Sequence, residues 1–266
     1  MNTQALNLAI EALQPHVLAI ALISARLIPV AFLCPLFGGS HAPMHVKLGL
    51  VLALALFLHG AGGVGAPAGV HGAFDLAALS AQELLFGTSL GLVAALPFDA
   101  ARMGGRFIDL FRGSSAEAAL PMAGSKEAAT GDALYHLLLA LGSAGALLPL
   151  MLAALTKSYG LVAPGAFHHT EDVALHLAGL VGTAFATGFA IGAPIAGLTL
   201  TIDACLGLAS RASPNMNLQE TGAPLRILGG GAVLWLMVGL IASRLQDFAL
   251  THADELVSLS FMGLKG

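Results

Sequence analysis

Charged residues are scarce in this chain of 266 residues. Asp, Glu, Lys and Arg make up only 10% of it, hydrophobic residues make up 57%, and the mean hydropathy is +0.85. Soluble domains carry about 25% charged residues. Because so little polar surface would not keep an isolated chain in solution, we expect an integral membrane protein or a subunit of a large hydrophobic assembly.

Cysteine and clustered positive charge are scarce too. Cys34 and Cys205 are too few for a disulfide framework, and both lie in apolar runs typical of buried thiols. The net charge of −4 is spread along the chain, which gives no indication of nucleic-acid binding. The N-terminus lacks the basic segment of a signal peptide, so the first apolar run, 19–37, is expected to stay in the mature protein.

Patterns that carry catalysis or bind metals are also missing. The chain has no G-x-x-x-x-G-K-[ST] phosphate loop, and its acidic residues are scattered singly rather than paired. Gly87-Thr-Ser-Leu-Gly91 lies inside an apolar run and is interpreted as a helix-packing segment. The densest histidine group, His168-His169, lacks the i, i+4 spacing of a helical metal motif, which favours a solvated loop. We expect no enzyme, no cofactor and no metal.

What the sequence does contain is a series of long apolar segments without strand alternation. We predict an all-α fold of hydrophobic helices, organised as a single domain over 1–266. Pro15, Pro29, Pro97 and Pro194 lie inside these segments, so kinked or split helices are expected. The predicted helices cover 5–36, 44–62, 76–112, 131–159, 172–210 and 224–257.

Among the charged residues of the predicted helices, Arg26, Glu83, Asp109 and Asp203 lie where a lipid-facing helix should carry no charge. A charge at the centre of a bilayer costs about 2.5–3.5 kcal/mol, so these helices are expected to face protein or water. The charges either pair between subunits and hold an assembly in register, or they serve a secondary transporter or small-solute channel. We favour the first interpretation, because no inverted repeat of the kind found in many transporters is apparent.

Two polar connections interrupt the apolar pattern. The first, 103–126, has Gly104 and Gly105 near its start and also contains Phe and Met. This composition fits either a plain loop between helices or a flexible segment that closes an opening. From the residues alone, the plain loop is the simpler interpretation. The second runs Arg211-Ala-Ser-Pro-Asn-Met-Asn217 and is expected to cap helix ends and form a turn between two packed helices.

The chain resembles the FliR/SctT family, the export-gate subunit of flagellar and virulence type III secretion systems. The resemblance covers about residues 15–250. It rests on the order of several short sequence motifs, called marks below, rather than on any single one. Two departures are Asn215, where the family usually has Gln, and Leu218, where Phe is often found. The marks are Arg26-Leu-Ile-Pro29, Pro35-Leu-Phe-Gly-Gly39, Pro43 with Lys47, Glu83 with Gly87 and Gly91, Gly104-Gly-Arg-Phe-Ile-Asp109, Ser158-Tyr159 with Pro164-Gly165, Ala193-Pro194, Arg211 to Asn217, and Pro224-Leu-Arg-Ile227.

The resemblance implies a structural and gating role rather than catalysis. One copy of this subunit would join about five copies of a P/R-type subunit and about four of a Q/S-type subunit in a helical export gate, rather than form a conventional transmembrane bundle. An export switch protein of the B/U type and unfolded export substrates would be further partners. The location would be the bacterial inner membrane, at the base of a flagellar basal body or an injectisome.

The resemblance also assigns roles along the chain. The plug of the closed pore corresponds to a loop at about 107–125, whose mobility the neighbouring glycines would supply. Residues expected to act in closure are Gly104, Gly105, Phe107, Phe111, Leu120, Pro121 and Met122. Residues expected to have structural or interface roles are Arg26, Pro29, Glu83, Asp109, Asp203, Arg211, Pro214 and Asn217.

Overall fold

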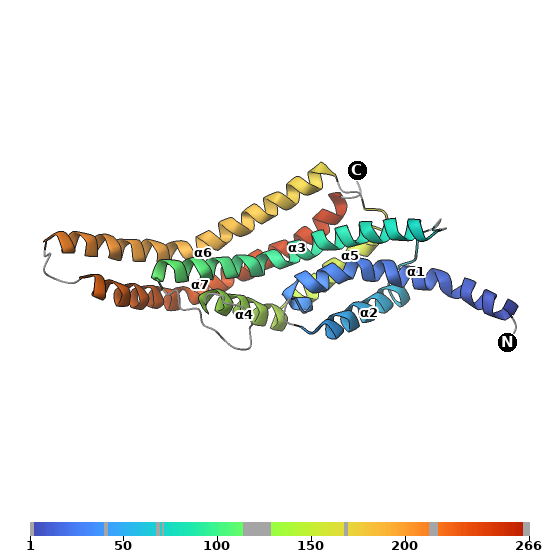
Figure 1. Cartoon of the computed structure of the whole chain (residues 1–266), viewed down its shortest axis with the longest axis horizontal. Coiled ribbons are helices and arrows are strands. Elements are labelled where there is room, and N and C mark those ends of the chain that lie inside the picture. The colour runs from blue at the N-terminus through green and yellow to red at the C-terminus, as the bar shows by residue number, and fades with distance from the viewer. Residues whose placement is uncertain are drawn as a thin grey trace. The chain divides into compact units, whose positions relative to one another are not determined.

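The computed structural model describes residues 3–39, 42–67, 70, 72–113, 129–167, 170–212 and 218–262, with the backbone alone for 3–10 and 218–221. Within these ranges the chain contains helices joined by short connections and no strand, which confirms the all-α prediction (Figure 1). The elements are α1 (Thr3–Leu33), the 3-10 helix η1 (Pro35–Phe37), α2 (Met44–Gly60), α3 (Ala73–Arg112), α4 (Ala129–Ala144), α5 (Leu147–Leu161), α6 (Glu171–Ala212) and α7 (Leu218–Met262).

The predicted helix 131–159 is in fact two helices, α4 and α5, separated at Gly145 and Ala146. Pro149 explains the break, because it has no N–H to donate to the carbonyl of Gly145 and is tolerated only in the first turn of a new helix. By contrast, α1, α3 and α6 continue through the four prolines that were expected to kink or split them. The expectation that those prolines split the helices is therefore wrong, and the expected kinks stay a prediction.

The chain divides into two compact units, which are described one at a time. Unit 1 consists of Met1–Ala95, Ser143–Leu180 and Leu250–Gly266, and unit 2 consists of Leu96–Gly142 and Val181–Ala249. Unit 1 thus contains α1, α2 and α5, and unit 2 contains most of α4. Both units include part of α3, α6 and α7. The assignment of 1–266 to a single domain stays a prediction.

In unit 1, α1 packs against both α2 and α3. Helices α1 and α2 lie side by side (Figure 1). A Cβ atom on Gly87 of α3 would lie 2.1 Å from the carbonyl oxygen of Arg26, and one on Gly91 would lie 3.1 Å from that of Pro29. Glycine therefore lets the backbones of α3 and α1 come into direct contact. The largest buried apolar side chains of this unit include Leu22, Ile23, Phe86, Leu90, Met151 and Phe167.

In unit 2, small residues again bring helices together. A Cβ atom on Gly105 of α3 would lie 2.3 Å from the Cα of Gly131 on α4, and one on Gly104 would lie 3.0 Å from the Cβ of Ile191 on α6. The two glycines thus lie on a helix that packs tightly on both sides. The buried apolar side chains of this unit include Phe98, Ile108, Leu134, Leu138, Ile195 and Leu245.

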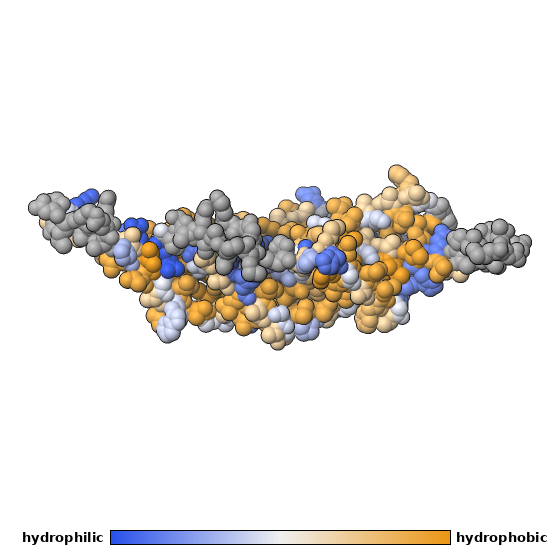
Figure 2. Space-filling view, turned by 60° about the horizontal axis from the view of Figure 1, so that its bottom comes forward, coloured by the Kyte–Doolittle hydropathy of each residue, from blue (hydrophilic) through white to orange (hydrophobic). Residues whose placement is uncertain are grey.

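Several helices carry apolar side chains on their outer faces. Among the described residues, α1 from Glu11, α3, α6 and α7 from Gly222 are each long and apolar enough to cross a membrane, and α4 with α5 forms a bent fifth candidate. In α7, Leu228, Trp235 and Leu236 are 71%, 77% and 73% exposed. Apolar residues cover much of the face seen in Figure 2. An apolar surface of this kind has to be covered by lipid or by protein.

Candidate functional site

The most deeply buried charges of unit 1 form an ion pair between α1 and α3. Arg26 and Glu83 are both 0% exposed. The guanidinium donates Nε–H to Oε2 of Glu83 at 2.6 Å and Nη2–H to Oε1 at 3.1 Å. Two parallel hydrogen bonds between planar groups are the strongest geometry that an arginine and a carboxylate form. The expectation that these charges pair between subunits is therefore wrong for Arg26 and Glu83, which pair inside unit 1.

Residues from α5 and the loop after it complete this arrangement. Arg26 donates to the carbonyl of Val162 at 3.1 Å and, at 3.4 Å, to that of Ser158. Its guanidinium lies 4.2 Å from the ring centroid of Tyr159, and the Tyr159 hydroxyl donates to the carbonyl of Ile23 at 3.0 Å. We call Arg26, Glu83 and Tyr159, with their backbone partners, the Arg26 cluster. It joins three helices with its charges fully paired, as buried charges require.

Gly165 closes the Arg26 cluster from the loop side. Its N–H donates to Oε1 of Glu83 at 2.7 Å. Its φ of +81° is a left-handed conformation, and a Cβ atom there would lie 2.5 Å from Cδ2 of Leu79. The positive φ favours glycine at this position, and any larger residue would also displace the Leu79 side chain. The sequence marks Ser158-Tyr159 and Pro164-Gly165, which are remote from Arg26 along the chain, thus contribute to one buried site.

The segment Gly87-Thr-Ser-Leu-Gly91 spells the G-x-S-x-G of a nucleophile elbow, yet it lies in the middle of α3. Ser89 donates its hydroxyl to the carbonyl of Leu85 within the helix at 3.1 Å. A nucleophile elbow requires a sharp turn between a strand and a helix. The interpretation of this segment as helix packing is confirmed by the contacts of its two glycines with α1.

In unit 2, Asp109 on α3 binds the beginning of α4. Its carboxylate accepts the backbone N–H of Thr130 at 2.8 Å and the Thr130 hydroxyl at 2.5 Å. One turn further along α3, Nη1 of Arg112 lies 3.9 Å from the Asp109 carboxylate, and Nη2 donates to the carbonyl of Ile227 on α7 at 3.3 Å. We call Asp109, Arg112 and Thr130 the Asp109 clamp. Asp109 therefore also has its partners within the chain.

The fourth helix charge, Asp203, lies closer to the surface. Its carboxylate is 3.1 Å from Nε of Arg226 on α7, and the two side chains are 42% and 34% exposed. Arg211 is exposed at the end of α6. Pro214 and Asn217 of the polar connection lie outside the described residues, so the predicted turn at this point stays a prediction.

The residues assigned to the plug fall in two groups. Phe107 and Phe111 belong to α3, which ends at Arg112 as the predicted helix 76–112 does, so residues 107–112 of the predicted plug are helix rather than loop. Phe107 stacks on Phe189 of α6 with ring centroids 4.1 Å apart. Gly104 and Gly105 serve close helix packing here. Leu120, Pro121 and Met122 lie outside the described residues, and Pro29 lies within α1.

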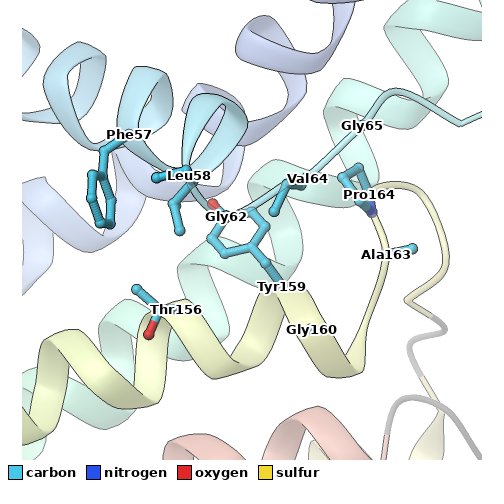
Figure 3. A pocket seen from close by; sticks show the side chains of 12 residues that line it. Phe57, Leu58, Gly62, Val64, Gly65, Thr156, Tyr159, Gly160, Ala163 and Pro164 are labelled. Atoms are coloured by element: carbon cyan, nitrogen blue, oxygen red, sulfur yellow. The ribbon is translucent and has the colours of Figure 1, made fainter.

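A pocket of about 530 Å³ opens in unit 1 between the end of α2 and the end of α5 (Figure 3). Phe57 and Leu58 line it from α2, and Thr156 and Tyr159 line it from α5. The loop Gly62–Gly65 completes the wall, and the lining carries no Asp, Glu, Lys, Arg or His. With the Tyr159 hydroxyl already bound to a carbonyl, the pocket offers apolar contact rather than a reactive group.

The structure brings together two histidines that lie 43 residues apart in the sequence. His16 Nδ1 on α1 lies 2.8 Å from His59 Nε2 on α2, and His59 Nδ1 lies 2.8 Å from the carbonyl of Val64. Because a carbonyl only accepts, His59 donates from Nδ1 and its Nε2 accepts from His16. Within the described residues there is no group of three or more potential metal ligands, and His168-His169 lie outside them.

The two cysteines differ sharply in environment. Cys34 is fully buried, and this burial raises the pKa of its thiol to about 12. Cys205 is exposed on α6, so the prediction of a buried thiol is wrong there. We expect a maleimide at pH 7 to label Cys205 and to spare Cys34, because the reactive species is the thiolate. Mass spectrometry of C205S checks this: label on the native variant would contradict it, and label after denaturation is the positive control.

The comparisons with known proteins match the chain over most of its length and agree on one family. The family model for bacterial export proteins, family 1, matches residues 17–251. The chain is 26% identical over 264 residues to the flagellar biosynthetic protein FliR of Bacillus subtilis (strain 168), covering 97% of this chain and 100% of that protein. It is 26% identical over 232 residues to the flagellar biosynthetic protein FliR of Aquifex aeolicus (strain VF5), covering 84% and 88% of the two chains.

Proposed function

This chain belongs to family 1 of the bacterial export proteins, and from that membership we propose that it is a structural and gating component of a type III protein export channel. The membership confirms the resemblance drawn from the ordered sequence marks. The observation that carries the proposal is the match over 17–251, which includes both the Arg26 cluster and the Asp109 clamp. Its long apolar helices fit a protein of the bacterial inner membrane.

The distribution of charge and apolar surface supports a subunit role. The four charges Arg26, Glu83, Asp109 and Asp203 are paired within the chain, whereas apolar side chains such as Trp235 and Leu236 face outward. A subunit packed among other helices needs this arrangement, because its outer surface is buried only on assembly. In our proposal these outer faces contact P/R-type and Q/S-type subunits in a ratio of about 5:4:1 with this chain, and an export switch protein of the B/U type.

The alternative, a secondary transporter or small-solute channel, would use the same four charges. A transport site needs charges that a substrate or water can reach. Arg26 and Glu83 are fully buried and bind each other, and Asp109 is 5% exposed and binds Thr130. Asp203 is accessible but is paired with Arg226. These contacts favour the subunit over the transporter.

The plug assignment has a direct test. Removing residues 114–122, which leaves α3 and its Arg112 contact with α7 in place, is expected to make the closed gate leak ions, because the material that fills the pore is lost. The measurement is the conductance of the purified complex, co-expressed with its partner subunits, in a planar bilayer. Equal recovery of the partners with both forms is the control for assembly, and an unchanged closed-state conductance would reject the plug.

A further inference from the structure

The carboxylate of Asp109 caps a helix to which it does not belong. Helix α4 begins at Ala129, and the N–H groups of its first turn have no partner within the helix. Thr130 donates both its N–H and its hydroxyl to Asp109, and the two residues are 8% and 5% exposed. A negative charge is favoured at this end of a helix, because the aligned peptide dipoles are positive there.

Arg112 extends the contact to a third helix. Its guanidinium lies between the Asp109 carboxylate and the carbonyl of Ile227 on α7. Helix α7 makes room for it with two glycines: a Cβ atom on Gly230 would lie 2.6 Å from Cγ of Arg112, and one on Gly231 would lie 3.3 Å from Nη2. Any larger residue at Gly230 would displace the arginine, so the glycines belong to the same contact.

Further contacts hold α3 and α4 together at the same level. One turn before Asp109, Gly105 packs against the backbone of Gly131. Another turn earlier, Arg102 lies 3.7 Å from the Asp132 carboxylate, with its guanidinium 4.0 Å from the ring centroid of Tyr135. The last three turns of α3 therefore all contact the first turns of α4. Asp109 provides the hydrogen bonds nearest to the connection between the two helices.

We infer that Asp109 is a positioning residue: through Thr130 and Arg112 it holds the end of α3, the start of α4 and the adjacent turn of α7 in one arrangement. The consequence at the pore rests on the proposed function, since the predicted plug is attached to these two helix ends. The clamp itself rests on the contacts alone. Displacing α4 or α7 from α3 would break these hydrogen bonds, so the clamp opposes any such movement.

Spin labels on the two exposed residues that flank the clamp, Leu110 and Ala129, test the positioning role. In the co-expressed complex carrying L110C, A129C and C205S, pulsed electron paramagnetic resonance is expected to give one narrow distance. With D109A added, the population of other distances should rise roughly 10- to 100-fold, the factor expected for loss of a hydrogen bond to a charged group. A distance that stays narrow in D109A would overturn the inference.

Matched variants separate positioning from general damage. T130V removes the hydroxyl donor at nearly constant volume and should broaden the distance, while T130S keeps both donors and should restore the narrow one. D172N removes the charge of an exposed carboxylate in the first turn of α6, which is no part of these contacts, and should leave the distance narrow. T130V also serves if D109A fails to assemble, and a narrow distance in T130V would then overturn the inference.

Conductance of the same complexes distinguishes the clamp from the plug. If D109A broadens the distance and the closed gate leaks, the positioning role of Asp109 and its consequence at the pore are both supported. If the distance broadens and conductance is unchanged, the clamp stands and its consequence at the pore is rejected, while the removal of 114–122 decides on the plug assignment. If the gate leaks while the distance stays narrow, the positioning role is rejected, because the leak has another origin.

Discussion

Replacing Glu83 by Gln, or Arg26 by Met, is expected to prevent the chain from accumulating in folded form. Each change leaves a buried partner unpaired, which costs about 3–5 kcal/mol, a large part of a total stability of about 5–15 kcal/mol. Loss of Arg26 also removes the donors to the carbonyls of Ser158 and Val162. The measurements are the yield of the co-expressed chain and its resistance to protease after extraction from membranes.

The double variant R26M/E83Q makes this expectation specific to the ion pair. Removing both charges leaves no unpaired ion, so the double variant should be more stable than the sum of the single changes predicts. The control is R226M, which breaks the part-exposed pair with Asp203 and should cost at most about 1 kcal/mol. Additive losses in the double variant would show that Arg26 and Glu83 do not stabilise each other.

Replacing Gly87 by Ala is expected to be almost as damaging, although it adds a single methyl group. The new Cβ would lie 2.1 Å from the carbonyl oxygen and 2.9 Å from the carbonyl carbon of Arg26, which are backbone atoms of a packed helix. Overpacking a core typically costs about 1–3 kcal/mol. Here α3 has to move away from α1, and that movement also separates Glu83, one turn earlier on α3, from Arg26.

Other glycines provide the comparison for G87A. A Cβ atom on Gly49 of α2 meets no atom within 4 Å, so G49A should be neutral or stabilising by up to about 1 kcal/mol. G91A, with its nearest contacts at 3.1 Å, should fall between the two. Thermal unfolding of the extracted chains measures the order. A midpoint for G87A equal to that of G49A would show that α1 and α3 are free to separate.

The helices themselves were largely predictable from the sequence. Five of the six predicted segments correspond to single helices, from α1 to α7, with ends that differ by a few residues. Apolar runs and Gly or Pro breakers are local signals, so they can be recognised without knowledge of the fold. The break before α5 was missed because Pro149 lies in an apolar run, where composition does not reveal it. The end of α3 at Arg112 was predicted as well, whereas the plug bounds of 107–125, which came from the resemblance, include the last residues of that helix.

The partners of the charged residues were not predictable. Arg26 and Glu83 are 57 residues apart, Asp109 and Thr130 are 21 apart, and His16 and His59 are 43 apart. The sequence indicated that the charges need partners, because a buried charge is costly anywhere in the chain. It did not indicate whether the partner is in the same chain or in another subunit.

The sequence by itself determined the class of protein and its family. Scarce charge and long apolar runs required helices that avoid water, and the order of the marks from Arg26 to Arg226 identified the bacterial export proteins. The tertiary structure alone decided that Arg26 binds Glu83 and that Asp109 caps α4. The physical reason is that the apolar character of a segment depends only on the residues of that segment. Which charged side chains pair depends on which faces of two helices contact each other. In this chain, glycines such as Gly87 and Gly105 determine how close those two helices lie.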